Sequence, residues 1–101
     1  MKIFKELKKL GYKHYTEHTV EELDDLPLDS EERIMEQALV FRWFREKYNY
    51  HHTIHQNKKY VGIAYSSVVN FSIDEFDTYE EAELACLVRL IDIVKADDSN
   101  T

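Results

Sequence analysis

Glycine, proline and cysteine are scarce in this chain, and each scarcity excludes a class of structure or site. The 101 residues include two glycines, one proline and one cysteine. Phosphate-binding P-loops and dinucleotide-binding turns need clustered glycines, so the isolated Gly11 and Gly62 effectively exclude both. Because loop-forming residues are few, regular elements joined by short loops should make up most of the fold.

Disulfides, membrane spans and secretion signals are not indicated either. Cys86 stands alone, so no intramolecular disulfide or cysteine metal cluster is possible, in agreement with a reducing compartment. No apolar run reaches the roughly 20 residues that a bilayer span requires. Residues 1–6 turn polar too early for a signal peptide. We therefore expect a cytoplasmic protein with no membrane partner.

Length and composition predict one domain over residues 1–101. Hydrophobic residues make up 44% and charged residues 33% of the chain, as in soluble globular proteins. The net charge of −7 hides alternating blocks, which are basic in 1–15, acidic in 16–40, basic in 41–60 and acidic beyond. Such blocks are usually solvated faces. The sharper alternatives are a basic patch for nucleic acid or an acidic surface that competes for a partner's basic site.

Helix starts are the best-marked local features. In residues 77–83, Thr78 and Glu81 form a capping box that closes an aromatic segment and begins a helix. A second box at 19–22 begins a helix of about two turns that Pro27 ends. Asp29 and Glu32 suggest a third box ahead of a long helix over 30–48. A short amphipathic helix over 2–10 comes first, with Gly11 as its C-terminal cap.

The long helix over 30–48 is apolar on two sides. One predicted stripe contains Ile34, Ala38, Phe41 and Tyr48, with Phe44 beside it; the other contains Met35, Leu39 and Trp43. We expect one stripe to cover the sheet. The other must be covered either by the N-terminal helices or by a second copy of the chain.

The spacing of apolar residues changes from helical to strand-like after this helix. Segments 49–55 and 59–65 are rich in aromatic and β-branched residues and predict an antiparallel hairpin around 56–58. Residues 68–73 either extend the second strand past a bulge or, as we favour, form a third strand. A final helix is expected over 78–96, followed by a frayed tail at 97–101.

These elements predict an α+β fold, with a small antiparallel sheet of two to three strands and two long helices on one face. Residues 1–28 would add one or two short N-terminal helices to a helix-hairpin-helix core over 29–96. The other face of the sheet would be open.

No catalytic, metal or cofactor site is expected. The histidines occur twice as HxxxH (His14, His18, and His51 with His52 and His55), but on a strand His51 and His55 would lie about 13 Å apart, too far to share an ion. Cys86 falls on the apolar stripe of the last helix, where a buried structural thiol is expected. The acids at 74, 75, 77, 80 and 81 are better explained by capping than by a paired-carboxylate site.

Two binding surfaces remain. If the N-terminal helices leave it exposed, the stripe of Met35, Leu39 and Trp43 predicts a protein interface, which a twofold homodimer would bury symmetrically. The alternative is a nucleic-acid-binding module on an aromatic and basic hairpin face, using the following residues: Arg42, Arg45, Tyr50, Lys58, Lys59 and Tyr60.

The chain also resembles a known group of proteins. Residues 43–48 (WFREKY), the aromatic hairpin and residues 76–82 (FDTYEEA) resemble small uncharacterised proteins encoded by bacteriophages and prophages of Bacteroidetes-type bacteria. The resemblance covers residues 30–95, and residues 1–28 fall outside it. It implies an intracellular, accessory and non-catalytic role. Our hypothesis is therefore a small protein that acts by protein binding, as a homodimer and with a possible further protein partner.

Overall fold

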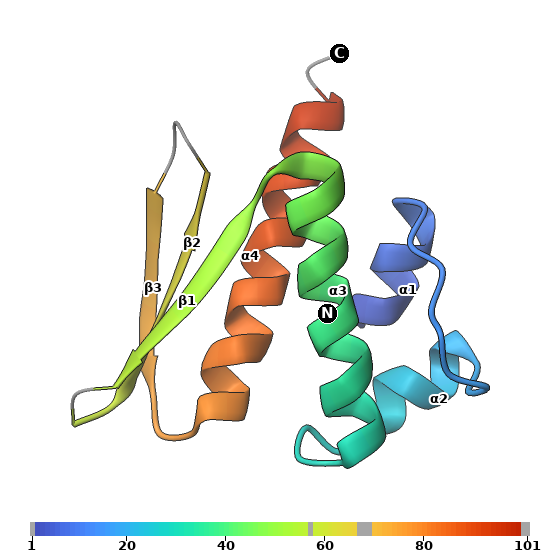
Figure 1. The fold of residues 1–101 in the computed structure, drawn as a ribbon, viewed down its shortest axis with the longest axis horizontal. Helices are drawn as coiled ribbons and strands as arrows, with labels where there is room; N and C mark the ends of the chain where they lie inside the picture. The colour runs from blue at the N-terminus through green and yellow to red at the C-terminus, as the bar shows by residue number, and fades with distance from the viewer. Residues whose placement is uncertain (1, 57, 67–69, 100–101) are drawn as a thin grey trace.

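The computed structural model describes residues 2–56, 58–66 and 70–99, which form four helices and three strands (Figure 1). In order, the elements are α1 (Ile3–Lys9), α2 (Val20–Asp25), α3 (Glu31–Tyr48), β1 (His51–Gln56), β2 (Tyr60–Tyr65), β3 (Asn70–Phe76) and α4 (Tyr79–Ser99). The predicted α+β fold with a small antiparallel sheet is confirmed.

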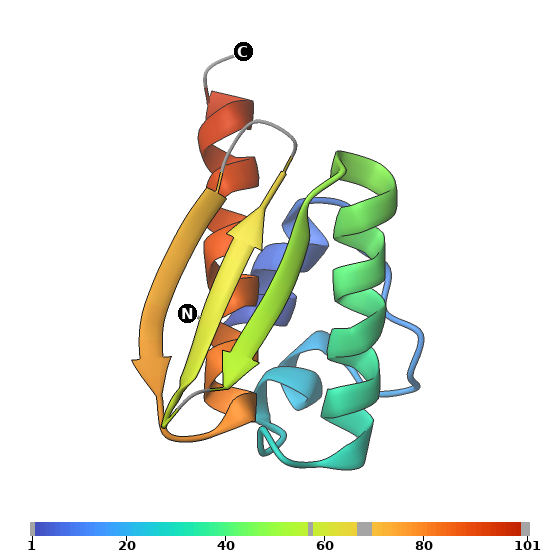
Figure 2. The same ribbon diagram turned by 60° about the vertical axis from the view of Figure 1, so that its left-hand side comes forward.

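The sheet has the order β1-β2-β3, and both pairs of strands are antiparallel. His51 pairs with Tyr65 at one end of the hairpin and Gln56 with Tyr60 at the other. The third strand that we favoured is present and ends at Phe76, three residues later than predicted; its first two predicted residues lie outside the described part. The helices lie on one face of the sheet and leave the other open (Figure 2).

Local capping places the helix starts. Glu81 donates its backbone N–H to the Thr78 hydroxyl at 3.2 Å, and Thr19 and Glu22 form a complete capping box. The prediction that Asp29 caps α3 is wrong, because Ser30 is the N-cap and accepts the backbone N–H of Arg33 at 3.3 Å. With Ser30 as N-cap, Glu32 is not at the capping-box position, and its carboxylate contacts the ring of His18.

Two residues with positive φ angles lie where α1 and α3 end. Gly11, with φ of 102°, follows α1, and Asn49, with φ of 57°, closes α3 in the left-handed conformation. Helix α4 continues to Ser99, three residues beyond its expected end at Ala96. No glycine or proline interrupts it, and the ion pair of Lys95 with Glu6 holds its last turns against α1.

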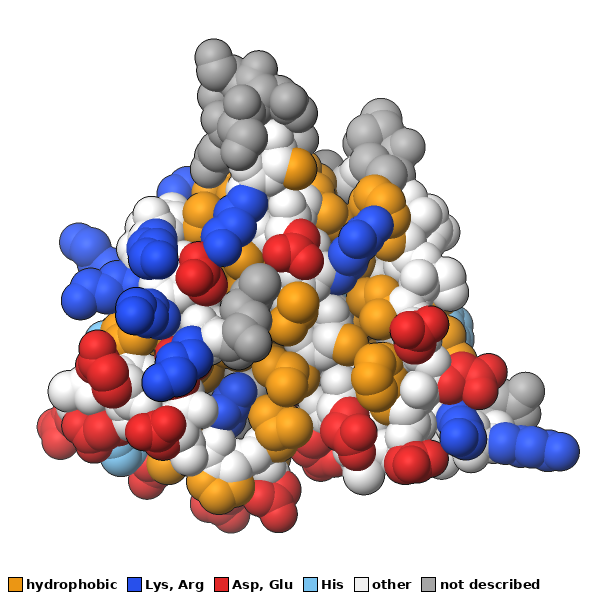
Figure 3. Space-filling model, turned by 180° about the vertical axis from the view of Figure 1, so that it is seen from behind, with side chains coloured by type: hydrophobic (Ala, Val, Ile, Leu, Met, Phe, Trp, Pro, Cys, Tyr) orange, Lys and Arg blue, Asp and Glu red, His pale blue; other side chains and the backbone are white. Residues whose placement is uncertain are grey.

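The core extends on both sides of the long helices, which pack on the sheet on one side and on α1 and α2 on the other (Figure 1). Ile3, Phe4 and Leu7 of α1 are fully or almost fully buried, so the N-terminal helices share the core of the long helices. Helix α4 packs closely on the sheet at Gly62, where a Cβ atom would lie 2.7 Å from the Sγ atom of Cys86. Seen from behind, α4 and β3 present apolar side chains between charged ones (Figure 3).

The inward face of α3 differs from the prediction. Its buried residues are half polar: Arg33, Glu36, Gln37, Val40, Phe41 and Phe44. Phe41 and Phe44 were placed correctly, whereas Ile34 and Ala38, assigned to the same stripe, are exposed. The helix is rotated because three polar side chains find buried partners in the N-terminal segment and in α4.

Candidate protein-binding surfaces

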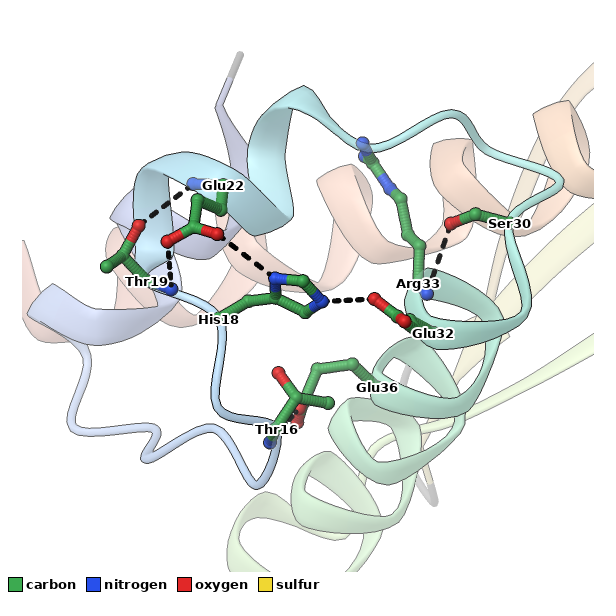
Figure 4. A network of polar contacts seen from close by, with 8 residues as sticks. All are labelled: Thr16, His18, Thr19, Glu22, Ser30, Glu32, Arg33 and Glu36. Carbon is green, nitrogen blue, oxygen red and sulfur yellow. Dashed lines mark hydrogen bonds and ion pairs between the residues drawn. The ribbon is translucent and has the colours of Figure 1, made fainter.

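A buried carboxylate holds the N-terminal segment onto α3. Glu36 has no solvent exposure, and it accepts hydrogen bonds from the Tyr12 hydroxyl and from the backbone N–H groups of Tyr15 and Thr16, both at 3.0 Å. Burial and the neighbouring Glu36 carboxylate raise the pKa of the Tyr12 phenol, so it stays protonated as the donor. Residues 10–19 therefore cross α3 along the side that Glu36 defines (Figure 4).

The second buried polar group is Arg33, one turn before Gln37. Its guanidinium donates to the carbonyl oxygens at the end of α2, at 2.8 Å to Leu26 and 3.1 Å to Asp24, and to the Gln37 side chain at 2.8 Å. The chain of contacts continues from Gln37 to Glu83 of α4, whose pKa is raised by burial. Arg33 thus satisfies the carbonyls that the end of α2 leaves unpaired.

A partly exposed histidine, His18, also joins the N-terminal segment to α3. His18 contacts Glu22 through Nδ1 at 3.2 Å and Glu32 through Nε2 (Figure 4). These contacts, first with Glu22 and then with Glu32, raise the pKa of His18. Together with the hydrogen bonds of Arg33 and Glu36, the His18 contacts fix the rotation of α3 about its own axis. This rotation decides which side of α3 faces solvent.

The solvent side of α3 carries an ordered stripe. Six exposed residues fall within about 100° of arc around the helix: Glu31, Ile34, Met35, Ala38, Arg42 and Arg45. The stripe is acidic at the start of the helix, apolar in the middle and basic at the end. We call these six residues the α3 stripe. Figure 1 shows α3 at the front of the domain.

The predicted interface of Met35, Leu39 and Trp43 is divided by the structure. The Trp43 ring is half-buried and meets the Tyr12 ring edge-on at a centroid distance of 5.5 Å. The Nζ atom of Lys47 lies over the same ring at 5.1 Å. Leu39 is half-buried, but 63% of Met35 is exposed. The N-terminal segment thus covers one end of the predicted stripe and leaves the other end open.

Comparison of the chain with models of protein families, with curated proteins and with solved structures finds no match. Any function must therefore be inferred from the residues of the chain itself. Within the described ranges, no helix is both long and apolar enough to cross a membrane. In the same ranges, no three His, Cys, Asp or Glu side chains converge as metal ligands would.

The residues of the nucleic-acid alternative do not gather on one surface. Arg42 and Arg45 lie near the end of α3, whereas Lys58 and Lys59 lie at the far end of β1, in the hairpin turn (Figure 1). Arg42 donates to Glu46 at 2.9 Å, and Lys59 pairs with Asp77 at 3.5 Å.

The two tyrosines of that alternative face the helices rather than the open sheet face. Tyr50 stacks on Tyr48 of α3 at a centroid distance of 6.0 Å, and Tyr60 meets Tyr79 of α4 edge-on at 6.1 Å. The predicted aromatic platform for single strands is thus not formed by these residues.

The other candidate residues, His51, His52 and Cys86, pack against neighbouring side chains of the fold. His52 stacks on Phe41 at a centroid distance of 3.5 Å, and burial, with smaller effects from Arg45 and His51, lowers its pKa to about 4. His51 stacks on Tyr65 across the hairpin. Cys86 is fully buried, and burial raises the pKa of its thiol to about 11, far from that of a reactive nucleophile.

Sequence reasoning missed the residues that orient α3. Arg33, Gln37, Val40 and Phe44 recur at helical spacing, and Glu36 lies beside them, but the predicted apolar stripes included only Phe44 of these five residues. Polar residues on an apolar face signal buried partners, but the chain gave no local sign that residues 12–26 would supply them.

Proposed function

We propose that this protein acts by binding protein and not by catalysis, and that its first partner is a second copy of itself, bound through the α3 stripe. The observation that carries the proposal is the order of charges along the stripe, with Glu31 at one end, Arg42 and Arg45 at the other, and Ile34, Met35 and Ala38 between them.

This order is self-complementary under a twofold axis. When two copies of α3 pack antiparallel, the acidic start of one meets the basic end of the other, and the midpoint between Glu31 and Arg45 is Ala38. A small residue at the crossing point lets two helices approach closely. The stripe is about 21 Å long, which covers four turns of helix.

Further exposed apolar surface borders the stripe. Tyr15 is 74% exposed, and its hydroxyl is close enough to Arg42 to contribute to the raised pKa of that guanidinium, after the larger effect of Glu46. The surface area that the α3 stripe can bury is at the small end of the range for specific interfaces, whose standard size is roughly 800 Å² per partner. We therefore expect a dimer that dissociates in the micromolar range.

The resemblance to phage and prophage proteins supports an accessory role inside a bacterial cell. The single buried Cys86 is compatible with a reducing cytoplasm. Of the two binding hypotheses, protein binding is favoured because the α3 stripe is contiguous, whereas the nucleic-acid set is divided between two ends of β1.

Sedimentation velocity from about 1 to 200 µM tests the proposal through a charge swap. Glu31→Lys and Arg45→Glu should each weaken the dimer, because each places like charges opposite one another. The double variant should restore the dimer, since the introduced lysine of one copy then faces the introduced glutamate of the other.

Glu21→Lys is the matched control, because Glu21 is also an exposed acid in the first turn of a helix but lies on α2. It should leave the dimer unchanged. A wild-type protein that stays monomeric at every concentration would contradict the proposal, and so would a double variant no better than the single ones.

A further inference from the structure

A groove lies between the edge strand β3 and the flank of α4, on the side opposite the α3 stripe. Its volume is about 470 Å³. The floor is apolar and half-buried, formed by Ile73, Phe76, Leu84, Ala85 and Val88, and the rim is charged, formed by Asp74, Glu81, Arg89 and Asp92. Figure 3 looks onto this side of α4 and β3.

The groove runs beside an unpaired sheet edge. In the described part of the chain β3 pairs only with β2, so one edge of Asn70–Phe76 directs its backbone donors and acceptors outward. The groove lies between β3 and α4, beside that edge. A fourth strand added to β3 would direct alternate side chains onto Leu84, Ala85 and Val88.

A bulge makes this edge selective. Ile63 pairs with Ser72 and Val61 with Glu75, so β3 has one residue more than β2 over this interval. Asp74, within the bulge, lines the groove. Bulges and charged residues deter indiscriminate pairing of edge strands. A strand with basic side chains can still pair with this edge, because its charges complement the acidic residues there.

The charges of the rim decide between possible occupants. Three of its four charged residues are acidic, and the guanidinium of Arg89 lies over the Phe71 ring at 4.2 Å. A second copy related by a twofold axis would bring Asp74, Glu81 and Asp92 against the same acids. An occupant with basic side chains is complementary instead.

We propose that the groove binds an extended, basic segment of another protein, which adds to β3 as a fourth strand. Glu81 and Asp92 are separated by about 16 Å along α4. Seven residues of strand span about 20 Å. The favoured segment therefore has Lys or Arg at its first and seventh positions and β-branched residues at the third and fifth, all facing the groove.

This site is independent of the dimer. Helix α3 lies at the front of the domain in Figure 1, whereas Figure 3 views α4 and β3, which line the groove, from behind. A dimer formed through α3 thus leaves both grooves accessible, and variants at one site leave the other intact.

The probe is the synthetic peptide acetyl-Lys-Thr-Val-Thr-Val-Thr-Lys-amide, titrated into ¹⁵N- and methyl-labelled full-length protein and followed by NMR. We expect saturable shifts in the amides of β3 and in the methyl groups of Leu84 and Val88. Asp92→Lys should weaken binding about tenfold. Glu21→Lys makes the same charge change at an exposed residue of α2, which belongs neither to β3 nor to the groove lining, and should leave affinity unchanged.

Three results would overturn the proposal. One is the absence of saturable shifts at millimolar peptide in a protein whose spectrum shows it to be folded. Another is equal binding of the peptide with Glu in place of both Lys residues. The third is a concentration-dependent shift of the β3 amides without peptide, which would assign the groove to a second copy.

Discussion

The Tyr12 hydroxyl donates a hydrogen bond to the fully buried carboxylate of Glu36, and this contact ties the N-terminal segment to the long helix α3. A buried charge is tolerated when several donors surround it, as the backbone N–H groups of Tyr15 and Thr16 do here. The contact also determines which side of α3 remains exposed, so the proposed interface depends on it.

Removal of this carboxylate should destabilise the protein strongly. Glu36→Ala leaves the Tyr12 hydroxyl and two backbone N–H groups without their acceptor, at an expected cost of about 2–4 kcal/mol in the free energy of unfolding. Glu36→Gln keeps one acceptor oxygen and should cost less. Urea denaturation measures both, with the exposed Glu46→Ala as control. A Glu36→Ala variant as stable as that control would show that the contact does not hold the segment.

His52 should make the protein less stable in acid. Its folded-state pKa is lowered to about 4, mainly by burial, so below pH of about 6.5 the unfolded chain takes up a proton that the folded protein does not. Stability is therefore lost as the pH falls from about 6.5 towards 4. An NMR titration should find His52 neutral at pH 5.5, and a His52 pKa near 6.5 would refute the assignment.

His18 should behave in the opposite sense. Its pKa is raised by Glu22 and Glu32, so its contribution to stability is present below pH of about 6.5 and is lost as the pH rises through the folded-state pKa. In the same NMR titration, His18 should have a higher pKa than His52. The variant His18→Gln identifies the His18 signal by removing it. Identical midpoints for His18 and His52 would contradict both predictions.

Gly62 should be intolerant of even one methyl group. An added Cβ would lie 2.7 Å from the Cys86 Sγ atom, so Gly62→Ala should cost about 1–3 kcal/mol. Cys86→Ala removes the clashing sulfur, and the double variant should recover part of the loss. A thermal double-mutant cycle measures this coupling, and strictly additive effects would mean that α4 does not pack on β2 at this residue.

Much of the fold could be predicted because its signals are local. Thr78 caps α4 through a residue three positions away, and Asn49 and Gly11 end helices through their own backbone conformations. The enrichment of segments 49–55 and 59–65 in aromatic and β-branched residues likewise predicted the hairpin. Such features need no knowledge of where distant segments lie.

The exposed side of α3 could not be predicted in this way. Arg33 and Glu36 are buried because their partners, Leu26 and Tyr12, arrive from other segments of the chain. Without those partners both side chains belong on the surface, and hydropathy assigns Ile34 and Ala38 to the core in their place. The candidate interface thus moved from Trp43 towards Ala38, with Met35 common to both.

The most direct test of the proposed dimer is oxidation of Ala38→Cys. Two antiparallel α3 helices that cross at Ala38 approach to about 8 Å between axes, within reach of a disulfide. Cys86 is fully buried, so it does not compete with the new thiol. Glu75→Cys, exposed on β3, is the matched control.

At micromolar protein, mild oxidation should convert Ala38→Cys to a covalent dimer within minutes and leave Glu75→Cys largely monomeric. Addition of Arg45→Glu to Ala38→Cys should slow the reaction. Equal cross-linking rates for Ala38→Cys and Glu75→Cys would contradict the account that this protein pairs through α3.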